Sequence, residues 1–183
     1  NTYFSNVYRR IIDKDNKIEE NINNWHKHLN SFGLGNYLGY DHPVGQPGYV
    51  PNANFYNLWY PNQRWRGSTI VSNAIGQGEI LMTPIQLANV AATIANRGFF
   101  YTPHFVKGIQ GDFIDPKYKT KRATSISKEH FTNVIEGMAD VVSKGTARVA
   151  GIRGIEVCGK TGTIENFTKI DGVRTQLTDH SVF

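Results

Sequence analysis

Apolar residues recur at helical spacing through the first part of the chain. Aromatic and aliphatic side chains fall three or four positions apart between residues 2 and 13, which predicts a helix that ends near Asp13. A second helix is predicted over residues 16–32, because four apolar side chains share one of its faces. These are Ile18, Ile22, Trp25 and Leu29. The glycines at positions 33 and 35 are suited to end this helix.

The next stretch, residues 36–67, is rich in glycine, proline, asparagine and aromatic residues. It is too long for a simple turn, and ordered loops of this length usually carry function or cover a cleft. A short helix is predicted inside it, over residues 52–60.

A stronger helix is predicted to follow Thr83 and Pro84, which suit the N-cap and the first helical position. Its apolar residues lie on two sides, so the helix is predicted to be buried. Residues 99–106 are predicted to be extended. Ser127 is then expected to cap a helix that continues to about Val142.

The last part of the chain favours strands. In the stretch GIEVCGKTGT, residues 154–163, the β-branched residues predict a strand that begins at Ile155. Residues 179–183 predict a second strand beside it, after a polar segment that ends at Thr178. Cys158 is expected to be a small buried side chain. Helices followed by a pair of strands indicate an α+β fold.

Composition limits the classes of protein to which this chain can belong. With 183 residues, of which 39% are hydrophobic and 19% charged, the chain suits one globular domain. Its net charge of +5 is scattered apart from residues 117–122, and no nucleic-acid-binding module is present, so no nucleic acid partner is expected. One cysteine and six histidines without ligand spacing predict no metal, and no other cofactor is required.

Lys160 belongs to two overlapping motifs. From Gly154 the sequence matches G-x-x-x-x-G-K-T, the phosphate loop of nucleotide hydrolases, and from Lys160 it matches K-T-G-T. A phosphate loop needs a helix directly after its lysine, but Gly162 and β-branched residues follow here. A strand is therefore favoured, on which a lysine and threonines beside an open groove can bind a carboxylate. A nucleotide hydrolase is kept as a remote alternative.

Several segments together resemble one protein family. The K-T-G triplet is accompanied by G-Q-G and T-P-x-Q-x-A within residues 74–106, and by MADVVSKGTAR over residues 138–148. The opening NTYFSNVYRR is similar to the residues directly after a second family motif, S-x-N. The chain thus resembles class B penicillin-binding proteins, the transpeptidases that cross-link peptidoglycan, and it fits the elongation-type subgroup best. The resemblance extends over essentially the whole sequence.

The resemblance implies an incomplete penicillin-recognising serine transpeptidase fold, similar to that of β-lactamases, with helices and part of an antiparallel sheet. Residues 1–183 would form a partial domain, from the asparagine of S-x-N, Asn1, through the K-T-G strand and the strand after it. The S-x-x-K motif with the nucleophile, and the last strands, are expected outside the chain. Ser125 and Lys128 also match S-x-x-K, but they lie between the two later motifs, which is the wrong order.

The resemblance also implies roles for individual residues. Lys160 and Asn1 would be catalytic, the lysine in proton transfer and the electrostatics of the site, the asparagine in orienting the substrate amide. Thr161, Gly162 and Thr163 would bind substrate, with both threonines on the carboxylate of substrate or penicillin. A backbone N–H near Thr163 would help to hold the oxyanion.

The parent protein implied by the resemblance is a D,D-transpeptidase that forms an acyl-enzyme on a serine and passes it to an amine. Its expected partners are peptidoglycan stem peptides, β-lactam antibiotics and the cell-wall elongation machinery. Its expected location is the periplasmic face of the bacterial inner membrane, with an anchoring helix outside this chain. The segment alone is expected to be inactive. A non-catalytic penicillin-recognising sensor or scaffold on the same fold is the alternative.

Overall fold

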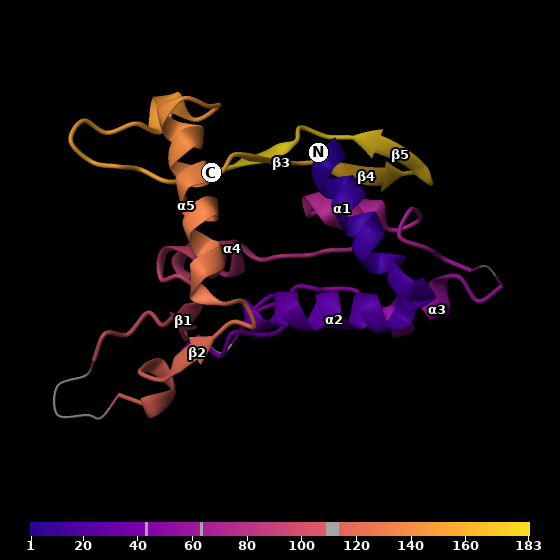
Figure 1. The fold of residues 1–183 in the computed structure, drawn as a ribbon, viewed down its shortest axis with the longest axis horizontal. Helices are drawn as coiled ribbons and strands as arrows, with labels where there is room; N and C mark the ends of the chain where they lie inside the picture. The colour runs from indigo at the N-terminus through magenta and orange to yellow at the C-terminus, as the bar shows by residue number, and fades with distance from the viewer. Residues whose placement is uncertain (43, 63, 109–113) are drawn as a thin grey trace. The chain divides into compact units, whose positions relative to one another are not determined.

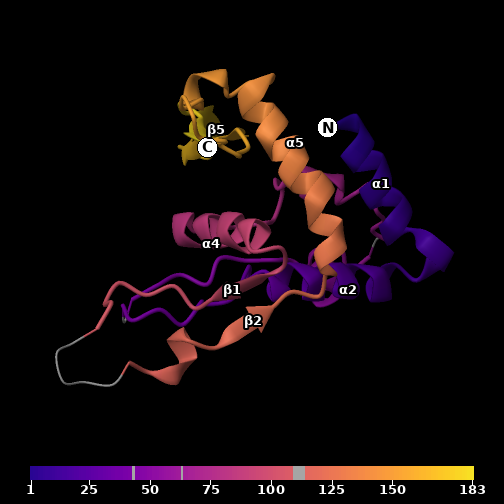
Figure 2. The ribbon, with the colours of Figure 1, turned by 60° about the vertical axis from the view of Figure 1, so that its left-hand side comes forward.

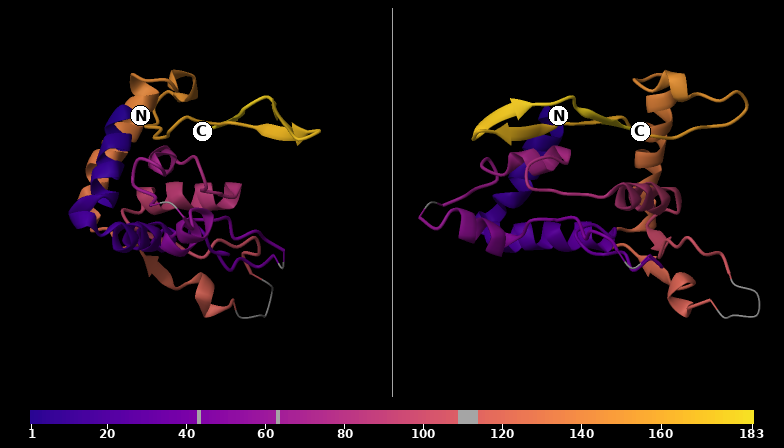
Figure 3. Two further views of the ribbon diagram at one scale, coloured as in Figure 1. Left: turned by 90° about the vertical axis from the view of Figure 1, so that its right-hand side faces the viewer. Right: turned by 180° about the vertical axis from the view of Figure 1, so that it is seen from behind.

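A computed structural model describes residues 1–183 except residues 43, 63 and 109–113. The chain divides into two compact units, Asn1–Ser127 and Lys128–Phe183. Figure 1 labels the helices and strands, and Figures 2 and 3 show them from other sides.

The helices of the first unit lie close to the predicted positions. They are α1 (Thr2–Ile12), α2 (Ile18–Ser31), α3 (Ala53–Trp59) and α4 (Pro84–Ala95). Short 3-10 turns also occur at Lys14–Asn16, Val71–Ile75 and Pro116–Tyr118. Two short strands, β1 (Phe99–Tyr101) and β2 (Lys121–Ala123), form an antiparallel pair. In Figure 1, α1 and α3 lie near the beginning of α2, and β1 and β2 lie near its end.

The end of α2 confirms the predicted glycine cap. The N–H of Gly33 donates to the carbonyl of Asn30 at 2.9 Å, and that of Leu34 donates to the carbonyl of Leu29 at 3.4 Å. Gly33 has a φ of +83°, and a Cβ at this position would lie 2.5 Å from a methyl carbon of Leu38. Only glycine adopts this turn without strain, so the helix ends here.

The core of the first unit gathers side chains from three helices and from the loops between them. Its buried members are Tyr8, Ile12, Ile22, Ala53, Tyr56, Trp65 and Ile70. Burial of each large apolar side chain contributes about 1.5–3 kcal/mol. The aromatic-rich loop that precedes α4 therefore packs into the core through Trp65 as well as through α3.

A chain of hydrogen bonds crosses this core. The side-chain amide of Asn73 donates to the hydroxyls of Tyr56, at 2.6 Å, and Tyr8, at 3.3 Å. The Tyr56 hydroxyl in turn donates to Oε2 of Glu79 at 2.9 Å. Burial raises the pKa of both tyrosines well above the ordinary value, so both hydroxyls remain protonated. The network joins α1, α3 and the 3-10 turn that carries Asn73.

Helix α4 begins as predicted, but its buried face is polar. Thr83 and Gln86 form a capping box, with the Gln86 N–H donating to the Thr83 hydroxyl at 3.4 Å. The buried residues are Gln86, Asn89 and Thr93, whereas the apolar sides stay partly or fully exposed, so the prediction of a buried apolar helix is wrong.

The polar face of α4 is buried because its side chains donate hydrogen bonds to the carbonyls of the loop after α2. The Gln86 side-chain amide donates to the carbonyls of Gly33, Asn36 and Pro47, at 3.2, 3.0 and 2.8 Å. Asn89 donates to the carbonyl of Phe32 at 3.0 Å. The loop after α2 lacks regular structure, so its buried carbonyls need donors from side chains.

The predicted extended segment 99–106 contains a strand of only three residues, β1. Beyond it, the two carboxylate oxygens of Asp41 accept the N–H groups of Phe105 and Val106, each at 2.8 Å. These two bonds lower the pKa of Asp41 below its ordinary value of 3.8. The carboxylate thus joins two loops that are distant in sequence.

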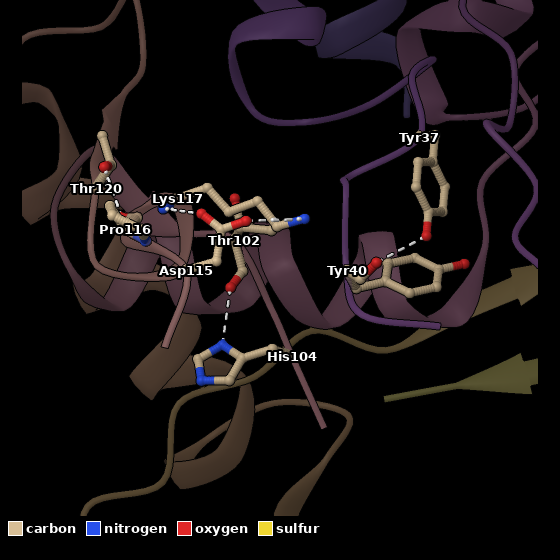
Figure 4. A network of polar contacts seen from close by, with 8 residues as sticks. All are labelled: Tyr37, Tyr40, Thr102, His104, Asp115, Pro116, Lys117 and Thr120. Carbon is tan, nitrogen blue, oxygen red and sulfur yellow. Dashed lines mark hydrogen bonds and ion pairs between the residues drawn. The ribbon is translucent and has the colours of Figure 1, made fainter. Parts of the chain in front are cut away.

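Figure 4 shows the polar contacts near the second of these loops. Asp115 caps the 3-10 turn Pro116–Tyr118, accepting the Lys117 N–H at 2.9 Å, and its carboxylate pairs with the Lys117 ammonium at 3.7 Å. The Thr120 hydroxyl donates to the carbonyl of Pro116 at 2.8 Å. His104 contacts the carbonyl of Thr102 through Nδ1 at 3.1 Å.

The second unit begins with a 3-10 turn, Lys128–His130, followed by α5 (Phe131–Ser143). The N-cap of α5 is His130, so the prediction that Ser127 caps this helix is wrong. The interposed 3-10 turn moves the beginning of the helix toward the C-terminus. A further 3-10 turn, Arg148–Ala150, follows α5.

Four strands complete the second unit. They are β3 (Gly162–Ile164), β4 (Phe167–Ile170), β5 (Val173–Gln176) and β6 (His180–Val182). β3 pairs with β6 as predicted, and β4 pairs with β5, both antiparallel. Residues 155–161 lie outside the ladder, so the K-T-G strand is shorter than predicted. Cys158 is exposed rather than buried.

The hairpin β4–β5 was not predicted from the sequence. Its two-residue turn is Asp171-Gly172, with φ values of 52° and 79°. An Asp-Gly pair between residues of high β propensity is a strong hairpin signal, because both turn positions require a positive φ. The segment before the closing strand is therefore ordered as a hairpin.

The hydrogen-bonded core network gives a first prediction. Asn73→Ala leaves the Tyr8 hydroxyl without its donor in a buried site, and we expect the free energy of unfolding to fall by about 1–3 kcal/mol. Urea denaturation followed by circular dichroism measures the change. Asn54→Ala, at an exposed position of α3, is the control and should change stability by much less. Equal losses in both variants would contradict the prediction.

The Asp41 contacts give a second prediction. Because the pKa of Asp41 is lowered in the folded chain, its contribution is present above the unfolded pKa and is lost as the pH falls through the folded value. In an NMR titration Asp41 should titrate below 3.8, and the amide signals of Phe105 and Val106 should shift with it. In Asp41→Asn these amides should show no such transition. A pKa above 3.8 would disprove the assignment.

Candidate functional site

The residues after Lys160 form a strand. β3 pairs with β6 in the register Gly162 with Val182, Thr163 with Ser181 and Ile164 with His180. A phosphate loop requires a helix at this position. The nucleotide-hydrolase alternative is therefore wrong. The predicted strand is confirmed from Gly162 onward, whereas Lys160 itself lies two residues before β3.

Two glycines allow the end of the chain to approach this segment closely. A Cβ at Gly159 would overlap the aromatic ring of Phe183, and a Cβ at Gly162 would lie 2.8 Å from a methyl carbon of Val182. A side chain would fit at either position only if the Phe183 ring or the Val182 side chain moved. In this structure the missing side chains are explained by packing against β6 and its end.

The other contacts of the K-T-G segment come from α5 and the residues after it. The N–H of Gly159 donates to the carbonyl of Met138 at 3.1 Å. The hydroxyls of Thr161 and Thr146 are hydrogen-bonded at 3.0 Å. Sequence reasoning did not single out Thr146, although it lies in the family-like segment 138–148. Its contact shows that this segment supports the K-T-G threonine directly.

The predicted site residues of the second unit are contiguous and largely accessible. Lys160 and Thr163 are exposed, and Thr161 and Gly162 are partly buried. The Lys160 ammonium donates to the carbonyl of Thr161 at 2.5 Å, and no carboxylate among the described residues pairs with it. An exposed ammonium and an exposed hydroxyl on a fixed backbone can bind an anionic group.

Asn1 belongs to the first unit. It occupies the N-cap position of α1, where its carbonyl accepts the Ser5 N–H at 3.0 Å. Its side chain makes no capping hydrogen bond, although asparagine is among the residues best suited to do so. The amide is therefore not committed to the helix.

The S-x-x-K string that begins at Ser125 has a contact that the sequence did not indicate. The Ser125 hydroxyl lies 2.5 Å from Nδ1 of His28 and 3.1 Å from the hydroxyl of Ser31. Ser125 and His28 are exposed, and Ser31, the last residue of α2, is partly buried. Within the described part of the chain, no carboxylate is hydrogen-bonded to His28, so the pair lacks the third group that orients a catalytic base. The contact fastens the loop at residue 125 to α2.

Two other kinds of site are absent from the described residues. No group of three or more histidine, cysteine, aspartate or glutamate side chains among them is arranged to hold a metal ion. None of the described helices combines the length and the apolar character that a membrane crossing demands.

Comparison with known proteins gives one consistent result. The family model described as "Penicillin binding protein transpeptidase domain" matches residues 1–183. The peptidoglycan D,D-transpeptidase MrdA of Acinetobacter baumannii is 32% identical over 155 residues, which are 80% of this chain and 22% of that protein. MrdA of Haemophilus influenzae is 29% identical over an alignment that covers 100% of this chain and 28% of that protein.

Solved structures agree in fold. Pseudomonas aeruginosa PBP2, in complex with WCK 5153, superimposes with a TM-score of 0.72 at 28% identity, covering 88% of this chain and 35% of that one. Helicobacter pylori PBP2 in its complex with MreC gives a TM-score of 0.66 at 32% identity, covering 88% and 28%. The predicted α+β fold of the penicillin-recognising type is thereby confirmed.

The chain matches only part of the length of each relative. The chain spans between about a fifth and about a third of the length of these relatives, from 22% of the A. baumannii protein to 35% of the P. aeruginosa chain. Within that share, the family match covers both units. The chain belongs to the penicillin-binding protein transpeptidase family.

Proposed function

We propose that residues 1–183 are one part of a serine-type peptidoglycan D,D-transpeptidase and supply substrate-binding and catalytic groups to its active site. The observation that carries this proposal is the K-T-G segment, fixed between β6 and α5 with its ammonium exposed. Membership of the transpeptidase family and the names of the MrdA relatives support it.

Lys160 and Asn1 are the proposed catalytic residues of this chain. The ammonium of Lys160 supports proton transfer and stabilises negative charge as the acyl-enzyme forms and breaks. Asn1 orients the substrate amide with a side chain that α1 does not use. The nucleophile is a serine of an S-x-x-K motif outside residues 1–183, and residues 1–183 form a partial transpeptidase domain.

Thr161, Gly162 and Thr163 are the proposed substrate-binding residues. The hydroxyls of the two threonines bind the carboxylate of the substrate, and Gly162 keeps the strand free of a side chain. The backbone N–H near Thr163 donates to the oxyanion of the tetrahedral intermediate. Thr146 holds the Thr161 hydroxyl in place through their 3.0 Å contact.

The proposed substrates are stem peptides that end in D-Ala–D-Ala. The serine attacks the amide carbonyl between the two alanines, D-alanine leaves with a proton, and an amine of a neighbouring stem peptide then displaces the serine. β-Lactams acylate the same serine. A solved structure of H. pylori PBP2 with MreC supports a partner in the cell-wall elongation machinery, and the parent is proposed to act at the periplasmic face of the inner membrane.

The role of Lys160 can be tested in the full-length transpeptidase. Lys160→Ala should lower the rate of acylation by a fluorescent penicillin by about 10²- to 10⁴-fold, because the ammonium no longer supports proton transfer. Lys169→Ala removes an equal charge from β4 and should acylate at the wild-type rate. Wild-type acylation by the Lys160 variant would contradict the proposed site. A non-catalytic sensor would show no turnover of stem peptides in the unmodified protein.

The placement of the nucleophile gives another prediction. Purified residues 1–183, which lack the proposed serine, should not be labelled covalently by fluorescent penicillin, since removal of a nucleophile costs about a million-fold in rate. Mass spectrometry of the treated chain measures this, with the full-length protein as the positive control. A penicilloyl group on Ser125, or on any other residue of the chain, would show that the nucleophile lies inside it.

A further inference from the structure

The first unit contains a cavity that the proposed function does not use. It has a volume of about 1030 Å³ and lies between the beginning of α2, the end of α3 and the residues that follow α3. Ligand pockets commonly have volumes of roughly 300–1,000 Å³. Its lining includes neither Asn1 nor residues 160–163.

Two arginines that line this cavity flank a buried residue in the sequence, Trp65. Trp65 is only 6% exposed, and its indole N–H donates to Oδ1 of Asn57 at 2.8 Å. The N–H of Arg66 donates to the Thr69 hydroxyl at 3.2 Å. These bonds anchor Trp65 and Arg66, while the side chains of Arg64 and Arg66, on either side of the tryptophan, are exposed.

The negative groups that line the cavity are already engaged. The carboxylate of Glu20 pairs with the Lys17 ammonium at 3.2 Å. Oε1 of Glu19 accepts from the side-chain amide of Asn57 at 3.1 Å, so Asn57 joins Glu19 of α2 to Trp65. In contrast, neither arginine forms an ion pair with any residue that the structure describes. The cavity thus has two guanidinium groups available for an anion.

We propose that this cavity binds a short acidic peptide whose two carboxylates pair with Arg64 and Arg66. A guanidinium matches a carboxylate in shape and charge. Glu19 and Glu20 line the same cavity and oppose a densely charged ligand such as polyphosphate, whereas the side chains of the cavity's asparagines can bond to peptide amides. Peptide binding here is separate from the proposed transpeptidase chemistry, since no residue assigned to that chemistry lines the cavity.

The spacing of the arginines suggests the probe. They are two positions apart along the chain, and alternate residues of an extended peptide project to the same side about 6–7 Å apart. An acetylated and amidated Glu-Gly-Glu peptide therefore presents two carboxylates at a matching interval. Isothermal titration calorimetry with the full-length transpeptidase should detect its binding, and the Gln-Gly-Gln peptide should bind at least about tenfold more weakly.

Two double variants distinguish binding at the cavity from general electrostatic attraction to the protein. Arg64→Gln combined with Arg66→Gln should weaken binding of the acidic peptide by at least about tenfold. The matched control, Lys27→Gln combined with Arg153→Gln, removes two positive charges from exposed positions outside the cavity and should leave binding unchanged. Acylation by fluorescent penicillin should remain at the wild-type rate in both double variants, so this test is independent of the proposed active site.

Three outcomes would overturn the inference. The first is absence of peptide binding to the wild-type protein. The second is an equal loss of binding in the arginine and control variants, which would mean that the peptide is attracted only by the net charge of the protein. The third is tighter binding of inorganic polyphosphate than of the peptide at equal ionic strength, which would assign the cavity to a phosphate polymer.

Discussion

The pairing of β3 with β6 is the contact on which the arrangement around Lys160 depends. Glycine at positions 159 and 162 leaves no side chain between the two segments, so Phe183 and Val182 close against the backbone. On the other side, Met138 accepts a backbone hydrogen bond. The backbone that carries the lysine is thereby fixed from two directions, and the ammonium remains at the surface. A charged group held in this way can bind an anion with little rearrangement.

The first unit is organised by amide and hydroxyl groups as much as by apolar contacts. Asn73 connects two tyrosines in the core, and Gln86 donates to three carbonyls of the loop after α2. Both residues are almost fully buried. Long loops without regular structure carry many backbone groups, and buried side-chain amides are one way to satisfy them. At the cavity, the exposed Asn57 instead joins two side chains, those of Glu19 and Trp65.

The K-T-G segment and the cavity belong to different units of the chain. The K-T-G segment belongs to Lys128–Phe183, and the cavity with its paired arginines belongs to Asn1–Ser127. The family match covers both units. Peptide binding at the cavity is thus proposed independently of the chemistry at Lys160, because no residue assigned to that chemistry lines the cavity.

The sequence by itself determined the positions of the helices, the glycine cap of α2, the Thr83 cap and the pairing of the closing strand with the K-T-G strand. These features depend on local periodicity, capping chemistry and β propensity. Tertiary structure alone decided that α4 buries its polar face, that Cys158 is exposed and that Ser127 does not cap α5. It also brought Thr146 to Thr161 and placed the two arginines on one cavity. Burial and partnership of this kind depend on segments distant in sequence, so periodicity cannot reveal them.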